Sequence, residues 1–119
     1  MDIPKLLDMP KGEKKVNIFD FIFRCSRNSH IMNNILRFIF GCDIPCKTKI
    51  GKNVVFNHKA MGVVIHPNAV IEDNVYIEHH VCLGQRIGSD VSAPIIRKDC
   101  VICAYSVILG GLKLVREAL

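Results

Sequence analysis

The sequence predicts an all-β solenoid, a parallel β-helix of about four coils, preceded by a short N-terminal helical segment. Two periodicities carry this prediction. From Ile44 onward a large apolar residue recurs every six positions, and a small or β-branched residue usually stands four places after it. Before Gly41, apolar residues recur at helical spacing instead. We therefore expect an N-terminal helical segment over residues 1–41 and a β-helix domain over residues 42–119.

The six-residue repeat is interrupted twice, which divides it into three runs. The large apolar residues are, in order, Ile44, Ile50 and Phe56; Ile65, Ile71, Ile77 and Leu83; and Ile96, Ile102, Ile108 and Leu114. Each hexad would form one short strand and a bend. Three hexads would then close a triangular coil of roughly eighteen residues, and coils would stack at about 4.8 Å. Gly51-Lys52-Asn53 and Glu72-Asp73-Asn74 suit the bends, because Gly, Asn and Asp tolerate unusual backbone angles.

Both ends of such a solenoid expose strand edges that need a cover. The N-terminal helices would cover one end. No sequence feature suggests a cap for the other end, and the stretch from Leu114 to Leu119 is expected to stop within a coil.

Two apolar stretches before the repeat have helical spacing. Their apolar residues include Ile18, Phe19, Ile22 and Phe23, and then Ile31, Ile35, Phe38 and Ile39. Gly41 follows the second stretch and is typical of a helix stop. Neither stretch is long enough to span a bilayer. We expect both to pack on the repeat domain or on a neighbouring subunit; a membrane-surface helix, aided by Arg24, Arg27 and Arg37, is the less favoured alternative.

The charge pattern argues against nucleic-acid binding. The net charge is +5, but the sequence has no block of like charge and no interleaving of basic and aromatic residues. A modest positive field would suit a small anionic ligand instead.

Six cysteines occur without a recognisable signal peptide at the N-terminus. We therefore expect a reducing cytoplasm, and thiols that act as small apolar residues. Cys100-Val-Ile-Cys103 is a lone CxxC, with no second pair at zinc-ligand spacing, so no metal or redox role is expected for it.

Between Cys42 and Gly110 the sequence resembles the hexapeptide-repeat acyltransferases, and among them the serine acetyltransferases. The resemblance is carried by Ile50-Gly51-Lys52, Phe56–Val64, Ala69–Val75 and Val81–Gly84, and by the three-residue offset after His58. It implies left-handed coils and a homotrimer with active sites in the clefts between subunits. An extended loop would lie beside each site, here at residues 88–95. The implied reaction is transfer of the acetyl group of acetyl-CoA to the hydroxyl of a small acceptor, first of all L-serine, for cysteine biosynthesis.

The same resemblance implies roles for individual residues. His58 would be the catalytic general base, because an imidazole can take a proton from a hydroxyl near neutral pH. Asn57 and His58 would bind the acceptor, and Gly84, Ala104 and Ser106 would line the coenzyme cleft. Acetyl-CoA is the expected co-substrate, and no metal is expected.

Two positions depart from the serine acetyltransferase pattern. Asn57 stands where those enzymes have an aspartate, and Ser92-Ala93-Pro94 stands where they have Arg-His-Pro. Without the arginine, the carboxylate of serine lacks an obvious partner. Two alternatives therefore stay open: an O-acetyltransferase acting on a sugar or a surface-polysaccharide precursor, and a catalytically inactive, truncated repeat protein.

The other histidines offer a metal alternative. γ-Class carbonic anhydrases resemble this chain in their coils and bind zinc with histidines. Here His58, His66 and either His79 or His80 would supply three ligands. His79 and His80 are expected on a strand, where their side chains would point to opposite faces. The sequence around them resembles the acetyltransferases more closely, so this alternative is the weaker one.

Overall fold

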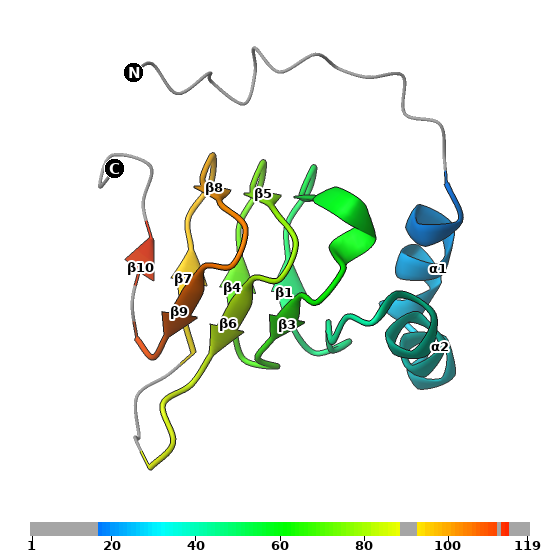
Figure 1. Cartoon of the computed structure of the whole chain (residues 1–119), viewed down its shortest axis with the longest axis horizontal. Helices are drawn as coiled ribbons and strands as arrows, with labels where there is room; N and C mark the ends of the chain where they lie inside the picture. The colour runs from blue at the N-terminus through cyan, green and yellow to red at the C-terminus, as the bar shows by residue number, and fades with distance from the viewer. Residues whose placement is uncertain (1–16, 89–92, 112, 115–119) are drawn as a thin grey trace.

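The computed structural model describes residues 17–88, 93–111 and 113–114. The helices α1 (Ile18–Ser26) and α2 (His30–Phe40) come first. They are followed by β1 (Lys49–Ile50), β2 (Val55–Phe56), the 3-10 turn η2 (Asn57–Ala60), β3 (Val64–Ile65), β4 (Val70–Ile71), β5 (Tyr76–Ile77), β6 (Cys82–Gly84), β7 (Ile95–Ile96), β8 (Val101–Ile102), β9 (Val107–Leu109) and β10 (Lys113–Leu114). Figure 1 shows the strands stacked in layers, with both helices at one end of the stack.

Each strand from β1 to β7 pairs in parallel with the strand three places further along the chain. Within the described residues the pairs form three sheets, with strand orders β1-β4-β7-β10, β2-β5-β8 and β3-β6-β9. Consecutive strands thus lie in different sheets, and the chain visits the three sheets in turn (Figure 1). The predicted parallel sheets and the helices before them are confirmed.

The spacing between paired strands follows the interruptions of the repeat. Where none intervenes, Val64 pairs with Cys82, 18 residues later. Val55 pairs with Tyr76, 21 residues later, across the three-residue offset. Tyr76 pairs with Val101, 25 residues later, across the second interruption. The interruptions therefore lengthen the connections without changing which residues face each other.

The large apolar residues of the hexads form the core of the strand region. The buried ones include Ile65, Ile71, Ile77, Leu83, Ile96 and Ile102, together with the small hexad positions Ala60, Ala69, Val75, Val81 and Cys100. Removing one large aliphatic side chain from water contributes about 1.5–3 kcal/mol. The stacked columns are therefore a main source of the stability of the fold.

Both helices have end residues that their sequences favour. The side chain of Asn17 accepts a backbone hydrogen bond at the start of α1, and that of Ser29 does the same at the start of α2. Gly41 follows α2 with a φ of 62°, and its N–H donates to the carbonyl of Arg37. The predicted helix stop at Gly41 is confirmed.

Apolar packing and one arginine join the helices to the first strands. Phe19, Ile22 and Leu36 belong to the same buried cluster as Cys42 and Ile44. The guanidinium of Arg27 donates to the carbonyl oxygens of Pro45 at 2.9 Å and Cys46 at 3.2 Å, and to that of Thr48. The helices thus cover the end of the stack next to β1, as Figure 1 shows.

The outer face of α2 is apolar. Ile31, Ile35, Phe38 and Ile39 are exposed there, Phe38 to 93%. Its contact with a neighbouring subunit stays a prediction. Within the part of the chain that the structure describes, no helix is long and apolar enough to cross a bilayer.

All six cysteines lie in the described residues, and no disulfide joins them. Burial, and then the charge of Asp43, raise the pKa of the Cys42 thiol to about 11. This thiol therefore stays protonated at neutral pH, as expected of a cysteine that packs as an apolar residue.

Candidate active site

The three-residue offset after Phe56 forms η2, at the corner between β2 and β3. Three successive residues, His58, Lys59 and Ala60, have positive φ angles of 50°, 54° and 57°. A left-handed conformation costs most residues roughly 1–2 kcal/mol each, and such strain gathers at functional sites. The turn buries Ala60 and leaves the His58 side chain exposed. This corner is therefore the first candidate for a site.

The equivalent corners of the following layers lie directly beside it. His79 and His80 form the turn between β5 and β6, and Tyr105 lies in the turn between β8 and β9. The N–H of His80 donates to the carbonyl of Met61 at 2.8 Å, and the N–H of Tyr105 donates to that of His79 at 3.2 Å. These backbone bonds stack the turns and bring their side chains together.

The prediction that His79 and His80 lie on a strand and point to opposite faces is wrong. Strand β5 ends at Ile77, and His80 has a φ of 54°, which turns the chain. The two imidazole rings are 5.5 Å apart, centroid to centroid. Both therefore belong to the same corner.

The rings of His58, His79, His80 and Tyr105 form a contiguous array. The ring of His58 meets that of His79 edge-on, with centroids 4.9 Å apart. His79 also meets Tyr105 edge-on at 5.5 Å, and His80 stacks on Tyr105 at 4.9 Å. Gly62 makes room for this packing, because a Cβ atom there would lie 2.0 Å from Nδ1 of His80.

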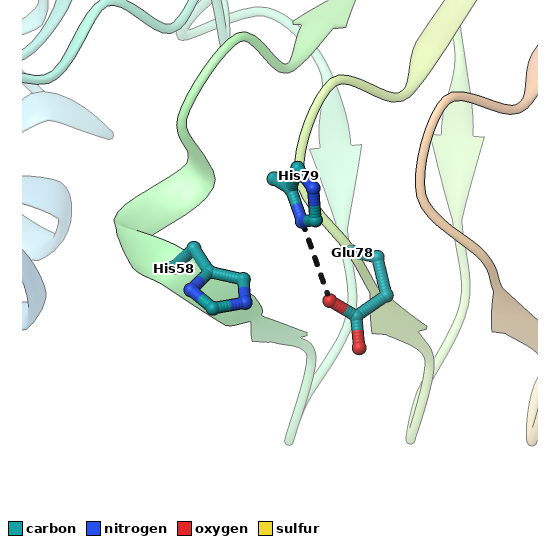
Figure 2. Close-up of side chains that lie close together, drawn as sticks. All are labelled: His58, Glu78 and His79. Atoms are coloured by element: carbon teal, nitrogen blue, oxygen red, sulfur yellow. Dashed lines mark ion pairs between the residues drawn. The ribbon is translucent and has the colours of Figure 1, made fainter.

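Glu78 joins this ring array to Asn57. The side-chain Nδ2 of Asn57 donates to Oε2 of Glu78 at 2.9 Å, and Nδ1 of His79 lies 3.7 Å from the same oxygen. Burial raises the pKa of Tyr76, and the charge of Glu78 and a hydrogen bond with it raise that pKa further. Figure 2 shows the side chains of His58, Glu78 and His79 gathered at this corner. The carboxylate thus lies among polar groups from two layers of the stack.

Glu78 is absent from the residues predicted from the sequence. It follows Ile77 just as Asn57 follows Phe56, and these two large residues face each other in the sheet. The register of the hexads would therefore have predicted that Asn57 and Glu78 are neighbours. The register predicts the position of Glu78 but not the direction of its side chain.

The same cluster has the donor atoms of a metal site. One ligand atom each from His58, Glu78 and His79 lies within 4.8 Å of the other two, and Nδ1 of His79 is buried without a hydrogen-bond partner among the described residues. Zinc bonds of about 2.0–2.1 Å would place tetrahedral ligand atoms roughly 3.4 Å apart, so the cluster would have to contract to hold zinc. His66, a ligand in the zinc alternative, is outside the cluster, and its Nδ1 accepts from the N–H of Asn68 at 3.0 Å.

Two of the three predicted coenzyme residues lie beside the ring array. Ala104 and Ser106 flank Tyr105 in the chain, and Oγ of Ser106 donates to the carbonyl of Cys103 at 2.7 Å. Gly84 lies at the far end of β6, where an added Cβ would approach Cδ2 of Leu109 at 3.2 Å. Coenzyme binding by these residues stays a prediction.

The second departure from the family pattern lies at the edge of the described residues. Ala93 is only 4% exposed, and the carbonyl of Pro94 accepts from the N–H of Val70 at 3.2 Å. Ser92 and the rest of residues 89–92 lie outside the described residues. Ala93 itself therefore offers no charge or base to an acceptor.

No family model matches the sequence. The chain is similar to the putative serine acetyltransferase of Schizosaccharomyces pombe, with 33% identity over 89 residues that cover 74% of this chain and 33% of that protein.

Two solved structures are similar in fold as well as in sequence. Serine acetyltransferase from Brucella abortus in complex with coenzyme A has a TM-score of 0.67 and 30% identity, covering 79% of this chain and 38% of that one. The Neisseria gonorrhoeae enzyme in complex with serine has a TM-score of 0.64 and 30% identity, covering 71% and 34%. The chain thus spans about a third of the length of these relatives. In sequence and in fold the chain resembles the hexapeptide-repeat acyltransferases, and the relatives that it matches are serine acetyltransferases.

Proposed function

We propose that this chain transfers the acetyl group of acetyl-CoA to the hydroxyl of a small acceptor, with L-serine as the first candidate. The observation that carries the proposal is His58, which a strained turn holds with its imidazole exposed and in contact with the ring of His79. The relatives solved with coenzyme A and with serine support both substrates. The product, O-acetylserine, would place the reaction in cysteine biosynthesis.

His58 acts as the general base in this proposal. Its imidazole takes the proton of the acceptor hydroxyl while that oxygen attacks the thioester carbon of acetyl-CoA. Backbone N–H groups stabilise the oxyanion of the tetrahedral intermediate. When the intermediate collapses, the carbon–sulfur bond breaks and the proton passes from His58 to the departing thiolate. Asn57 lies on the acceptor side, and Gly84, Ala104 and Ser106 line the coenzyme cleft.

We also propose a homotrimer with the site between subunits. The outer face of the β3-β6-β9 sheet supports this, because Val64, Val107 and Leu109 expose apolar side chains there. Val64 and Val107 both pair with Cys82, so they form one row across the sheet. This sheet begins directly after the corner that carries His58 and Tyr105. A partner packed on the row would lie beside that corner.

The remaining architectural proposals follow from the repeat. We propose left-handed coils, about four in number, over residues 42–119, with residues 1–41 as a helical segment that covers the first coil. The 18-residue separation of Val64 and Cys82 supports three hexads in a coil. The absence of disulfides among the six cysteines supports a reducing compartment such as the cytoplasm.

An assay of thiol release tests the activity. The chain is incubated with acetyl-CoA and a thiol-trapping reagent, once with L-serine, once with a panel of sugar nucleotides and once with no acceptor. We expect serine to raise thiol release above the rate without acceptor. We also expect added EDTA to leave that rate unchanged, because an imidazole base needs no metal. Loss of activity with EDTA would instead assign the cluster around His58 to a metal.

The sugar alternative is favoured by one observation, the burial of Ala93 where the family pattern has a histidine. Release of thiol with sugar nucleotides but not with serine would select this alternative. If no acceptor raises thiol release and calorimetry detects no binding of acetyl-CoA, the inactive repeat protein is the remaining interpretation.

A further inference from the structure

A base that accepts a proton becomes a cation, and its environment decides how well that cation is stabilised. His58 has a neutral amide, Asn57, as its preceding neighbour. The donating Nδ2 of that amide is directed at Glu78. An amide can orient an imidazole but cannot offset the charge of an imidazolium. An offsetting charge would therefore come from another residue.

Glu78 is a carboxylate in a suitable place. Its oxygen and a ring nitrogen of His58 lie within 4.8 Å of each other (Figure 2). The Glu78 side chain is only 24% exposed, so water screens its charge less than that of a surface carboxylate. Its neighbour His79 also contacts the ring of His58 edge-on, which limits where that ring can move.

The carboxylate is held in place before any substrate arrives. Asn57 donates to Oε2 of Glu78 at 2.9 Å, and Nδ1 of His79 lies 3.7 Å from the same oxygen. A fixed carboxylate stabilises a developing cation without the cost of reorganising at that moment. An aspartate at position 57 would place a second negative charge against Glu78, and like charges at this distance disfavour each other. The amide at position 57 and the carboxylate at position 78 therefore form a matched pair.

We propose that Glu78 is a positioning residue of this site: its carboxylate, fixed by Asn57, stabilises the imidazolium that His58 becomes during acetyl transfer. The inference rests on the proposed function and adds a residue that the family resemblance did not supply. It also assigns Asn57 a role in orienting Glu78, in addition to its predicted contact with the acceptor.

The test measures kcat and KM for Glu78→Gln, which keeps the shape of the side chain and removes its charge. We expect kcat to fall roughly 10- to 100-fold while KM changes less than about threefold, since a charge that matters only in the transition state affects kcat. In a His58→Ala background, Glu78→Gln should cause no further loss, because residues that act as a unit are not additive.

A charge exchange separates the electrostatic role from a structural one. The double variant Asn57→Asp with Glu78→Gln moves the carboxylate to position 57 and keeps an amide–carboxylate hydrogen bond. It should recover most of the kcat lost by Glu78→Gln, whereas Asn57→Asp alone should lower kcat. Glu72→Gln is the matched control: Glu72 also follows a large hexad residue and also carries an ion pair, with Arg97 at 2.9 Å, but at a different corner. It should leave kcat unchanged.

The outcomes are distinguishable. An active wild-type chain whose kcat is unaffected by Glu78→Gln would overturn the role of Glu78 and leave the proposed function standing. Failure of the exchange variant to recover activity, with its melting temperature unchanged, would also overturn it. A wild-type chain that is inactive with every acceptor would overturn the proposed function, and the role of Glu78 with it.

Discussion

His58→Ala is expected to lower kcat for acetyl transfer by about 10²- to 10⁴-fold, the usual contribution of a general base. The substitution removes the proton acceptor while leaving the backbone of η2 and the buried Ala60 in place. Steady-state measurement of thiol release from acetyl-CoA with L-serine, at saturating concentrations of both substrates, gives the effect directly. Binding of acetyl-CoA should change little, and calorimetry measures it.

His30→Ala is the control for this substitution. His30 is an exposed histidine on α2, distant in sequence from the ring array, and its removal should leave kcat within about twofold of the original, as for an ordinary surface change. Equal losses in the two variants would argue that histidine substitution acts through stability. An unchanged kcat in His58→Ala would remove the base from the proposed mechanism.

Ile77→Ala is expected to destabilise the fold by about 2–5 kcal/mol, the range for truncating a buried aliphatic side chain. Ile77 is 0% exposed and pairs with Phe56 on one side and Ile102 on the other. A cavity at this position would thus interrupt a column in the middle of the stack. Urea unfolding followed by circular dichroism measures the change in the free energy of unfolding.

Ile87→Ala is the matched control, because it makes the same chemical change at a side chain that is 104% exposed. Its free energy of unfolding should change by less than about 0.5 kcal/mol. A similar loss in both variants would contradict the assignment of the hexad columns to the core.

The strand order could be predicted from the sequence because the repeat is a local signal. Each large apolar residue marks one hexad and three hexads make a coil, so counting hexads across the interruptions is enough to expect Phe56, Ile77 and Ile102 in one column. Gly41 likewise indicates a left-handed backbone conformation at the end of α2, since few other residues adopt a positive φ so readily.

The arrangement at the corners could not be predicted in the same way. The direction of a corner side chain depends on backbone angles that neighbouring turns impose, as the φ of 54° at His80 shows. The strand alternation that would separate His79 from His80 stops at Ile77. Similarly, Arg27 binds carbonyl groups of residues 45–48, a contact that the spacing of charges along α1 does not predict.

The unequal spacing of the paired strands shows that core packing does not depend on the length of the connections between strands. Eighteen residues return the chain to its own column, and the additional residues of the longer spacings, 21 and 25, are taken up in the connections between strands. A connection can therefore gain or lose residues while the columns stay in phase. The η2 turn is one such insertion, and it presents the residue that we propose as the base. In a scaffold of this kind, new chemistry can be acquired through changes in corner length that leave core packing untouched.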